Sequence, residues 1–431
     1  FDQANILHEN CSISSTDAET CYDAVNHTIS SLCLQAMCVS MFLIQCYLVC
    51  IQTMQYYLQT GFGQADTGYG GTTSHRSMGL VQGSGAAPAT WTAVSTAIVD
   101  TYKRKGYGAS LYAGHNDSSL NVAALLYVDD TDLIHKPQKP QATEEEIVDY
   151  TQRATYYWAK LLQATGGNLK ATKCYWYLLS YKFNNGIATL KTLRDLSHHN
   201  IKIPQVQGDD VCIELKDNHT ASQVLGVWSS PGSTDNQHLK YMLTKGHDWI
   251  RRIKDSTLET QEVWQSFTTQ ALPSVKYGLI TLMTYRQEID DQFHGWYYQC
   301  LPSLGINRSI TKAWRTLPTE FQGLGLPNMS LEKLAASLSF IQHHRNKHTA
   351  IGKALKGTFE LCQLEVGLAG NFLQRKYNTY KVLASHSWFK VLWELLDHYK
   401  VKLTLMDTKI VPPREGGYAL MEHVITTLPC H

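Results

Sequence analysis

Two adjacent carboxylates at the end of an apolar run constrain this chain more than any other feature. Residues 121–126 are mostly apolar, and the tetrapeptide Tyr127-Val128-Asp129-Asp130 leads from them into a second strand-prone run. Two such runs around a short turn predict a β-hairpin that carries both acidic side chains at its tip. Negative charges held so close are unfavourable unless cations neutralise them. A pair of Mg²⁺ ions would do so, because they prefer carboxylate and phosphate oxygens and can clamp the reacting oxygens of a phosphoryl transfer.

The tetrapeptide alone also fits a plain turn, because Asp is common where a hairpin reverses. The interpretation therefore depends on further parts of the same site. Asp17, followed by Tyr22, offers a second acidic centre upstream. Two-metal chemistry requires a carboxylate from a separate strand, and Asp17 is the candidate. Alternatively, Thr16 and Glu19 form a capping box and Asp17 merely lies in the first turn of a helix.

Two further segments could complete the site. Gln82 and Gly83 lie in a run of small residues that would let the backbone approach a planar ligand, although a loop-to-helix junction would look similar. Downstream, Lys170 and Lys173 follow the glycine pair at residues 166–167. Cations there could face a leaving pyrophosphate, or they could simply suit the end of a helix.

Overall charge does not indicate a nucleic-acid partner, so any such surface must be local. The 431 residues include 38 Lys and Arg against 37 Asp and Glu, which gives a net charge of +1. Apolar residues recur at helical spacing at residues 239–253, and basic residues, among them Lys245, Arg251 and Arg252, occupy much of the remaining surface. This basic face could be merely solvated, or it could follow a phosphate backbone.

Cysteine usage indicates a reducing compartment. The chain contains 11 cysteines, an odd number, and none of them is part of a Cys-x-x-Cys pair. This pattern argues against a disulfide framework and against a zinc ribbon. We therefore expect an intracellular protein, in the nucleus, the cytoplasm or both, that is not secreted.

An uncharged stretch near the N-terminus allows two interpretations. Residues 24–65 contain no Asp, Glu, Lys or Arg, and residues 32–54 are rich in Leu, Met, Ile, Val and Cys. This length approaches that of a membrane span, but polar residues interrupt it and no basic cluster flanks it. We expect instead a pair of helices buried in a large core, and no membrane partner.

Taken in order, these segments resemble the palm of a reverse transcriptase, and most closely that of the non-LTR (LINE-type) retrotransposons. Four motifs and a primer-grip strand follow in the order of that family: Asp17 with Tyr22, Gln82-Gly83-Ser84, Tyr127-Val128-Asp129-Asp130, Gly167 to Lys173, and Leu225-Gly226-Val227. Residues 317–327 are similar to a segment that often follows the palm in such enzymes. The resemblance is strong to about residue 230 and looser beyond it.

The resemblance implies a role for each candidate. Asp17 and Asp129 would bind two Mg²⁺ ions, or Mn²⁺ in their place, with help from Asp130. Tyr22 would be the steric gate that selects deoxyribose by crowding the 2′-hydroxyl. The remaining candidates are grouped by what they would contact: Gln82, Gly83 and Tyr127 at the incoming nucleotide, Lys173 near the pyrophosphate as a proton donor, and Leu225, Gly226, Lys245, Arg251 and Arg252 at nucleic acid.

Three differences from the family pattern bear on these expectations. The residues before Asp17 are mostly polar where the family has an apolar strand, and Gly85 stands where Pro commonly follows the second motif. Only 16 residues precede Asp17. The resemblance therefore implies an N-terminally truncated fragment that lacks the fingers.

The expected fold is α+β. It has a polymerase palm with an antiparallel sheet and packed helices at residues 1–235, a helical thumb-like region at 236–345 and a helical C-terminal region at 346–431. The expected function is RNA-directed DNA synthesis by a nucleotidyltransferase with an RNA template, a DNA primer and deoxynucleoside triphosphates. Two alternatives remain open: a catalytically inactive remnant that only binds nucleic acid, and an RNA-directed RNA polymerase.

Overall fold

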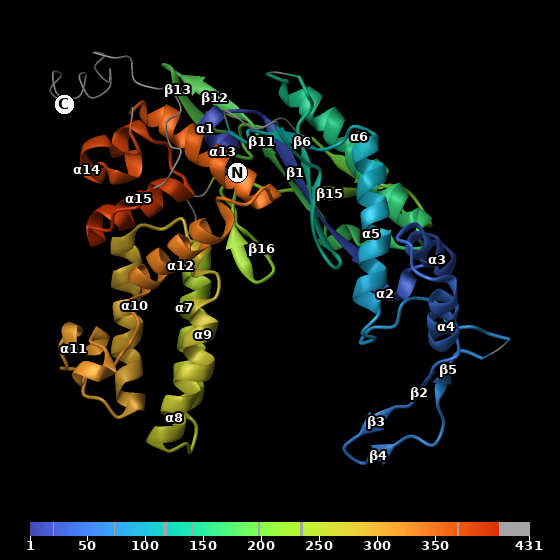
Figure 1. Ribbon diagram of the computed structural model, residues 1–431, viewed down its shortest axis with the longest axis horizontal. Coiled ribbons are helices and arrows are strands. Elements are labelled where there is room, and N and C mark those ends of the chain that lie inside the picture. The colour runs from blue at the N-terminus through green and yellow to red at the C-terminus, as the bar shows by residue number, and fades with distance from the viewer. Residues whose placement is uncertain are drawn as a thin grey trace. The chain divides into compact units, whose positions relative to one another are not determined.

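A computed structural model describes residues 1–19, 21–72, 74–114, 119–139, 141–196, 199–232, 236–368 and 370–404 (Figure 1). The chain divides into two compact units. Residues 9–110 and 121–217 form one, here called the sheet unit, and residues 1–8, 111–120 and 218–431 form the other, the helical unit. The finer division expected near residues 235 and 345 stays a prediction, and much of its last part, at residues 405–431, lies outside the described residues.

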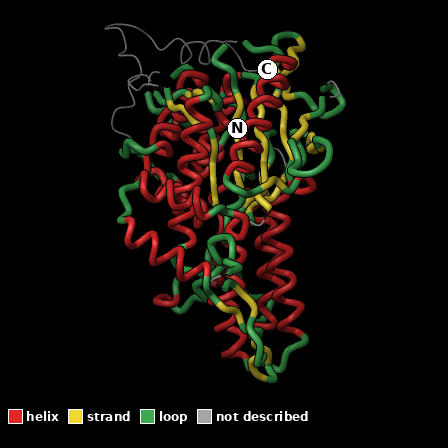
Figure 2. Tube along the Cα trace, turned by 90° about the vertical axis from the view of Figure 1, so that its right-hand side faces the viewer, coloured by secondary structure: helices red, strands yellow, loops and turns green. Residues whose placement is uncertain are grey.

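A sheet lies at the centre of the sheet unit, and Figure 2 shows its strands side by side. The strand order is β14-β15-β11-β1-β9-β8, with β10 beside β1. One neighbouring pair, β11 with β15, is parallel, so the sheet is mixed where an antiparallel one was expected. The strands are β1 (Cys11–Glu19), β8 (Ala124–Tyr127), β9 (Asp130–His135), β10 (Asn168–Leu169), β11 (Tyr175–Leu179), β14 (Ile201–Ile203) and β15 (Val211–Leu215).

The helix α6 (Glu144–Ala164) packs against strands β1, β9 and β14 of this sheet. It begins with a capping box: Thr143 Oγ1 accepts from the backbone N–H of Glu146 at 3.3 Å, and Glu146 Oε2 accepts from that of Thr143 at 2.9 Å. Its buried residues recur at helical spacing and include Ile147 and Trp158. The helix α5 (Ala87–Arg104) packs beside it.

Hydrogen-bonded hydroxyls let a polar sequence form the buried strand β1. Along β1 the burial alternates, so that Ser12 and Ser14 face α6. Ser12 Oγ lies 2.5 Å from Thr151 Oγ1, and Ser14 Oγ lies 3.2 Å from Thr155 Oγ1. Because each hydroxyl has a partner, burying it costs little. This explains why the strand before Asp17 need not be apolar.

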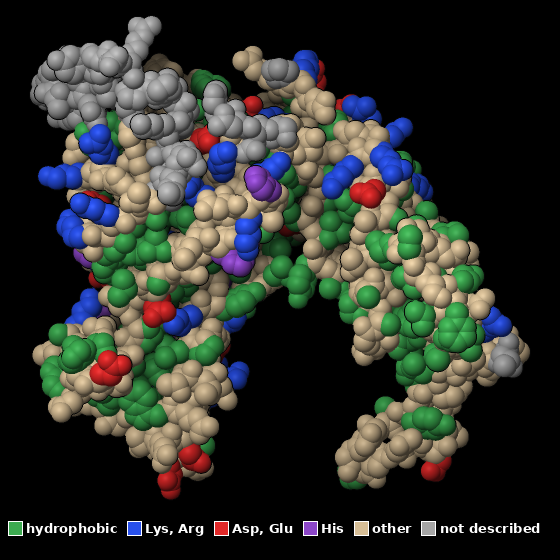
Figure 3. Space-filling model, in the orientation of Figure 1, with side chains coloured by type: hydrophobic (Ala, Val, Ile, Leu, Met, Phe, Trp, Pro, Cys, Tyr) green, Lys and Arg blue, Asp and Glu red, His purple; other side chains and the backbone are tan. Residues whose placement is uncertain are grey.

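The uncharged stretch forms α3 (His27–Ala36) and α4 (Met41–Gln52), but the expectation that this pair is buried is wrong. On α4 the buried residues are Ile44 and Ile51, whereas Phe42 is 71% and Leu43 is 59% exposed. A helix that is apolar on every side can bury only the side that meets a neighbour. Figure 3 shows apolar side chains gathered at the surface here. No helix among the described residues is long and apolar enough to span a membrane.

After α4 the chain forms two small hairpins that the sequence did not indicate. Their fully exposed tip carries Phe62. The hairpins and the remaining elements of the sheet unit are α2 (Cys21–Ala24), β2 (Gln55–Tyr56) with β5 (Tyr69–Gly70), β3 (Gln59–Thr60) with β4 (Gly63–Gln64), and β12 (Tyr181–Asn184) with β13 (Ile187–Leu190). Two further strands, β6 (Ala109–Leu111) and β7 (Leu120–Val122), pair with each other.

The helical unit is built around aromatic residues. One core surrounds Phe267, whose ring lies 5.8 Å from that of Trp296, and a second surrounds Phe359 and Trp393. Its elements are α1 (Asp2–Leu7), β16 (Ser222–Val224), β17 (Val227–Ser229), α7 (Gln237–Lys254), α8 (Thr260–Ser266), α9 (Leu272–Lys276), α10 (Arg286–Cys300), α11 (Lys312–Thr316), α12 (Met329–His344), α13 (Ala350–Val366), α14 (Tyr377–Tyr380) and α15 (Trp388–Tyr399). With a sheet-containing part followed by a largely helical one, the predicted α+β class is confirmed. Every cysteine among the described residues is free.

Candidate active site

The pairing of β1 with β9 brings together acidic residues that are far apart in the sequence. Asp17 lies directly opposite Asp130 in the antiparallel register, and the backbone N–H of Ala18 donates to the carbonyl oxygen of Asp129 at 3.2 Å. Directly opposed residues have Cβ atoms about 4.5–5.5 Å apart on the same face of a sheet. The alternative of a capping box at Thr16 is wrong, because this residue lies within β1.

Val128 and Asp129 form the two-residue turn between β8 and β9. Val128 has a φ of 57°, in the left-handed region that a β-branched residue rarely adopts. Its carbonyl oxygen accepts a hydrogen bond from Trp91 Nε1 at 2.7 Å and a weaker one from Cys21 Sγ at 3.9 Å. The surrounding helices thus hold a strained turn in place, as is common at functional sites.

Lys173 forms an ion pair with Asp17. Its Nζ lies 3.1 Å from Asp17 Oδ2, at the end of the 3₁₀ turn η1 (Ala171–Lys173). The hydrogen bond that Lys173 donates to Asp17 raises the pKa of Lys173, so the ammonium stays charged at neutral pH. Lys170 meets Asp17 through the backbone, where its N–H donates to the Asp17 carbonyl at 3.0 Å.

Negative charge accumulates on this face of the sheet. Burial raises the pKa of Asp130, and the nearby carboxylates of Asp129 and Asp17 raise it further. Burial and the same two carboxylates raise the pKa of the Cys21 thiol to about 12. The arrangement would therefore gain from a bound cation.

Asp132 is a fourth carboxylate on this face. It lies opposite Ser15 in the β1–β9 register, and a hydrogen bond from Ser15 lowers its pKa while burial, the larger effect, raises it. It is half-buried, and the charge of Asp130 also raises its pKa. Alternation along β9 places it there, because Asp130 and Asp132 point to the same side.

The chemistry of these residues fits a divalent ion such as Mg²⁺, which prefers carboxylate oxygens. The backbone places the three carboxylates of Asp17, Asp129 and Asp130 at one edge of the hairpin. Within the described ranges, however, no three His, Cys, Asp or Glu side chains already converge on one point. Asp17 is instead paired with Lys173.

Tyr22 is held beside this acidic face. Its carbonyl oxygen accepts from the backbone N–H of Leu80 at 2.7 Å, and its ring meets the edge of Trp91 at 6.5 Å between centroids. Gly79 approaches so closely that a Cβ there would lie 2.5 Å from the carbonyl oxygen of Asp23, which explains the glycine. The segment before the second motif is thereby anchored to Tyr22.

The other nucleotide-site candidates are open to solvent. Gln82 and Gly83 are both exposed, and Gly83 has a φ of 88° with no atom near the position of a Cβ. Tyr127 is 61% exposed at the end of the edge strand β8, opposite Asp130. The structure thus brings Tyr127 next to the acidic residues, and the roles of all three remain predictions.

The nucleic-acid candidates belong to the helical unit. Leu225 and Gly226 form the turn of the β16–β17 hairpin, and Tyr277 donates a hydrogen bond to the carbonyl oxygen of Leu225 at 2.7 Å. Lys245 Nζ lies 4.4 Å from the centroid of the Tyr241 ring, a cation–π distance. These residues form one local surface.

The remaining two basic candidates lie near the end of α7. Arg251 is exposed and pairs with Asp248 at 2.9 Å, and Arg252 is also exposed. An exposed pair such as that of Arg251 with Asp248 contributes little to stability, so Asp248 would not prevent Arg251 from binding an anion. Both guanidinium groups are exposed and therefore accessible to an anion.

Comparison with known proteins finds few similarities. No protein-family model and no curated protein sequence matches the chain. Among solved structures, the chain is similar to the telomerase from Candida albicans in complex with a TWJ fragment of telomeric RNA, with a TM-score of 0.34 and 12% sequence identity over 82% of this chain. The match covers 47% of that telomerase chain, so this chain spans about half its length. A TM-score this low assigns neither fold nor function.

Proposed function

We propose that the chain is the palm-containing part of an RNA-directed DNA polymerase, a reverse transcriptase of the retrotransposon (LINE-type) kind. The observation that carries the proposal is the β1–β9 register, which sets Asp17 opposite Asp130 and next to the Asp129 turn. Carboxylates from separate strands at one edge are what two-metal nucleotidyl transfer requires. The RNA template, the DNA primer and the deoxynucleoside triphosphates would meet at this edge.

In this proposal Asp17 and Asp129 hold two Mg²⁺ ions, or Mn²⁺, and Asp130 assists them. Ions bound there would help to deprotonate the primer 3′-hydroxyl and would neutralise the triphosphate. Lys173 is suited to donate a proton to the leaving pyrophosphate, because its ammonium lies 3.1 Å from Asp17 and stays charged. Binding of the substrates would require Lys173 to exchange Asp17 for phosphate oxygens.

Tyr22 would select the sugar, with Gln82, Gly83 and Tyr127 at the nucleotide. The support for this role is that Trp91 and the backbone of Leu80 fix Tyr22 beside the acidic face. A rigid ring there would crowd a 2′-hydroxyl, which favours DNA over RNA synthesis. Replacement of Tyr22 by Ala should therefore increase ribonucleotide incorporation relative to deoxyribonucleotide incorporation. Preferential use of ribonucleotides by the unaltered protein would favour an RNA-directed RNA polymerase.

The hairpin turn at Leu225 and Gly226, with Tyr241, Lys245 and Tyr277, would grip nucleic acid. Aromatic rings and a cation on one surface suit the stacking of bases and the pairing of phosphates. Arg251 and Arg252 would add phosphate contacts along α7. Binding through these groups should weaken as salt increases, because released counterions drive it.

Primer extension on an RNA template tests the proposal. With Mg²⁺, template, primer and deoxynucleotides, replacement of Asp129 by Ala should reduce extension by about 10²–10³-fold or more, as expected when a main source of transition-state charge stabilisation is lost. Asp209, which is exposed in a loop of the same unit, provides the control, and Asp209→Ala should extend normally. Normal extension by Asp129→Ala would disprove the mechanism.

A catalytically inactive remnant that only binds nucleic acid is the second candidate. The observation that favours it is the pairing of Asp17 with Lys173, together with the lack of a converged ligand group among the described side chains. Its signature would be salt-sensitive RNA binding without extension, even with Mg²⁺ present. Extension that depends on Asp129 would exclude this candidate.

A further inference from the structure

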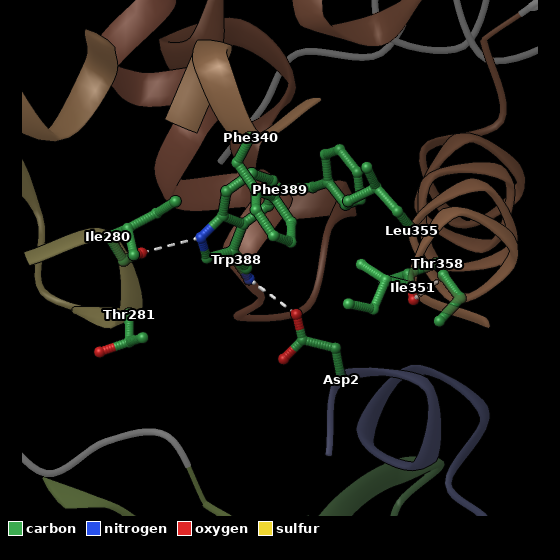
Figure 4. Close-up of a pocket in the computed structure, with 10 residues that line it drawn as sticks. Asp2, Ile280, Thr281, Phe340, Ile351, Leu355, Thr358, Trp388 and Phe389 are labelled. Carbon is green, nitrogen blue, oxygen red and sulfur yellow. Dashed lines mark hydrogen bonds between the residues drawn. The ribbon is translucent and has the colours of Figure 1, made fainter. Parts of the chain in front are cut away.

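The helical unit contains a pocket of about 470 Å³ that the proposed polymerase site does not use. Figure 4 shows side chains from five segments around it: Asp2 from α1, Ile280 from the 3₁₀ turn η3 (Leu279–Thr281), Phe340 from α12, Ile351 from α13 and Trp388 from α15. Its size lies within the range of small-molecule sites, about 300–1,000 Å³. The pocket is therefore large enough for a molecule of two fused rings.

The aromatic wall of the pocket is fixed before any ligand binds. Trp388 Nε1 donates to the carbonyl oxygen of Ile280 at 3.0 Å, so the indole has its polar partner and presents its apolar face (Figure 4). The ring of Phe340 lies 6.0 Å and that of Phe389 5.2 Å from Trp388, between centroids. An apolar ring could enter without reorganising this wall, which favours binding.

Asp2 gives the pocket one charged end. Among the described lining residues it is the one ionisable side chain, and its Oδ2 accepts from the backbone N–H of Trp388 at 2.9 Å. Trp388 begins α15, and the start of a helix favours a negatively charged group such as Asp2 beside it. The hydroxyls of Thr281 and Thr358 already donate to backbone carbonyls at 2.7 and 2.8 Å. Asp2 is therefore the group that would decide which polar ligand head is accepted.

We propose that this pocket binds a small aromatic amine, with the ring system against Trp388 and Phe340 and the ammonium at Asp2. Burial of the rings supplies the apolar gain, and a charge-assisted hydrogen bond to the carboxylate selects the cation. A carboxylate or phosphate ligand is disfavoured, because it would face Asp2 with like charge. The proposal is independent of the polymerase function, since none of its residues belongs to the acidic hairpin.

Three probes with the same rings test the charge selection on the full chain. The cation 2-naphthylmethylamine, the neutral 2-naphthylmethanol and the anion 2-naphthoate are compared by equilibrium dialysis at neutral pH. The amine should bind roughly tenfold more tightly than the alcohol, as for a hydrogen bond to a charged group, and the anion should bind least. Equal binding of all three, or no binding of the amine, would overturn the proposal without any variant.

Two variants locate the binding. Replacement of Asp2 by Asn should remove the preference for the amine and leave the affinity for the alcohol unchanged. Ile351→Trp, at a half-exposed lining position, should fill the pocket and weaken all binding, whereas Leu364→Trp, at an exposed position of the same helix outside the pocket, should not. Amine binding that survives Ile351→Trp would place the ligand elsewhere and refute the site.

Discussion

Two buried regions, the contact of β1 with α6 in the sheet unit and the core around Phe267 in the helical unit, are stabilised in different ways. At the centre of the sheet unit, His135 is fully buried with its ring nitrogens 3.3 Å from Ser12 Oγ and 3.0 Å from the Tyr102 hydroxyl. In the helical unit, Phe267 is fully buried among tryptophan rings. Apolar burial is roughly proportional to area and tolerates adjustment, whereas a buried hydrogen bond requires both partners at fixed positions. The buried hydrogen bonds around β1 therefore specify the position of this strand more tightly than apolar contacts alone would.

The largest expected effect is the loss of stability when an aromatic ring is removed from the core of the helical unit. Replacement of Phe267 by Ala leaves a cavity next to Trp296 and should lower the free energy of unfolding by about 3–5 kcal/mol. Phe321, which is exposed in the same unit, is the matched control, and Phe321→Ala should cost less than about 0.5 kcal/mol. Urea denaturation measures both, and similar losses would mean that the aromatic core is not the source of stability.

Acid should lower the free energy of unfolding through the buried His135 of the sheet unit. Burial lowers the pKa of His135 from 6.5 to about 3, so the folded state keeps the ring neutral where the unfolded chain takes up a proton. Stability from this group is complete above pH 6.5 and is lost as the pH falls, at up to about 1.4 kcal/mol per pH unit. Urea denaturation at pH 7, 6 and 5 should show a loss of about 2 kcal/mol in total.

The control for the acid effect compares two histidines. His135→Phe should flatten the pH dependence although it lowers stability at pH 7, because Tyr102 loses the hydrogen bond to His135 and Ser12 keeps only Thr151 as a partner. His348→Phe changes an exposed residue and should keep the slope. A slope that survives His135→Phe would assign the effect to other groups.

A double-mutant cycle measures the interaction energy between the hydroxyls of Ser14 and Thr155. Ser14→Ala leaves the Thr155 hydroxyl buried without its partner and should cost about 1–3 kcal/mol. Thr155→Val should cost a similar amount, but the double variant should cost less than the sum of the two. Additive losses in urea denaturation would show that the two hydroxyls do not interact.

The smallest expected effect is a gain in stability when Asp130 is replaced by Asn. Burial and the charges of Asp129 and Asp17 raise the pKa of Asp130, so the folded state loses stability as the pH rises and this carboxyl ionises. Asp130→Asn should therefore stabilise the fold at pH 7 by about 0.5 kcal/mol, a small value because solvent screens the charges, and the gain should vanish near pH 3. The melting temperature measures this, with Asp209→Asn as control, and a loss of stability at pH 7 would contradict it.

The sequence predicted those features that local patterns determine. The hairpin at Tyr127 to Asp130 follows from turn chemistry and alternation, which act over a few residues. The meeting of Asp17 with Asp130 is a long-range pairing, and the family resemblance indicated it where the residues alone left a capping box open.

Other features depend on contacts that no local pattern reveals. The exposure of α4 could not be predicted, because apolar residues look the same whether or not a neighbour covers them. The pairing of hydroxyls between β1 and α6 was equally hidden, since serine and threonine usually indicate surface. The hydrogen bond from Trp91 to the turn at Val128 joins distant segments and gives no signal in the sequence.

The hydroxyl pairs behind β1 have a consequence for how sequence changes in this chain are interpreted. Side chains alternate along the strand, so a slip by a single residue would turn Asp17 inward and leave Thr16 where the acid had been. Ser12 and Ser14 form hydrogen bonds to α6 on the buried face of β1, and these bonds oppose such a shift of the strand. Changes at these serines would thus weaken the alignment of Asp17 with Asp130 while every acidic residue stayed in the sequence.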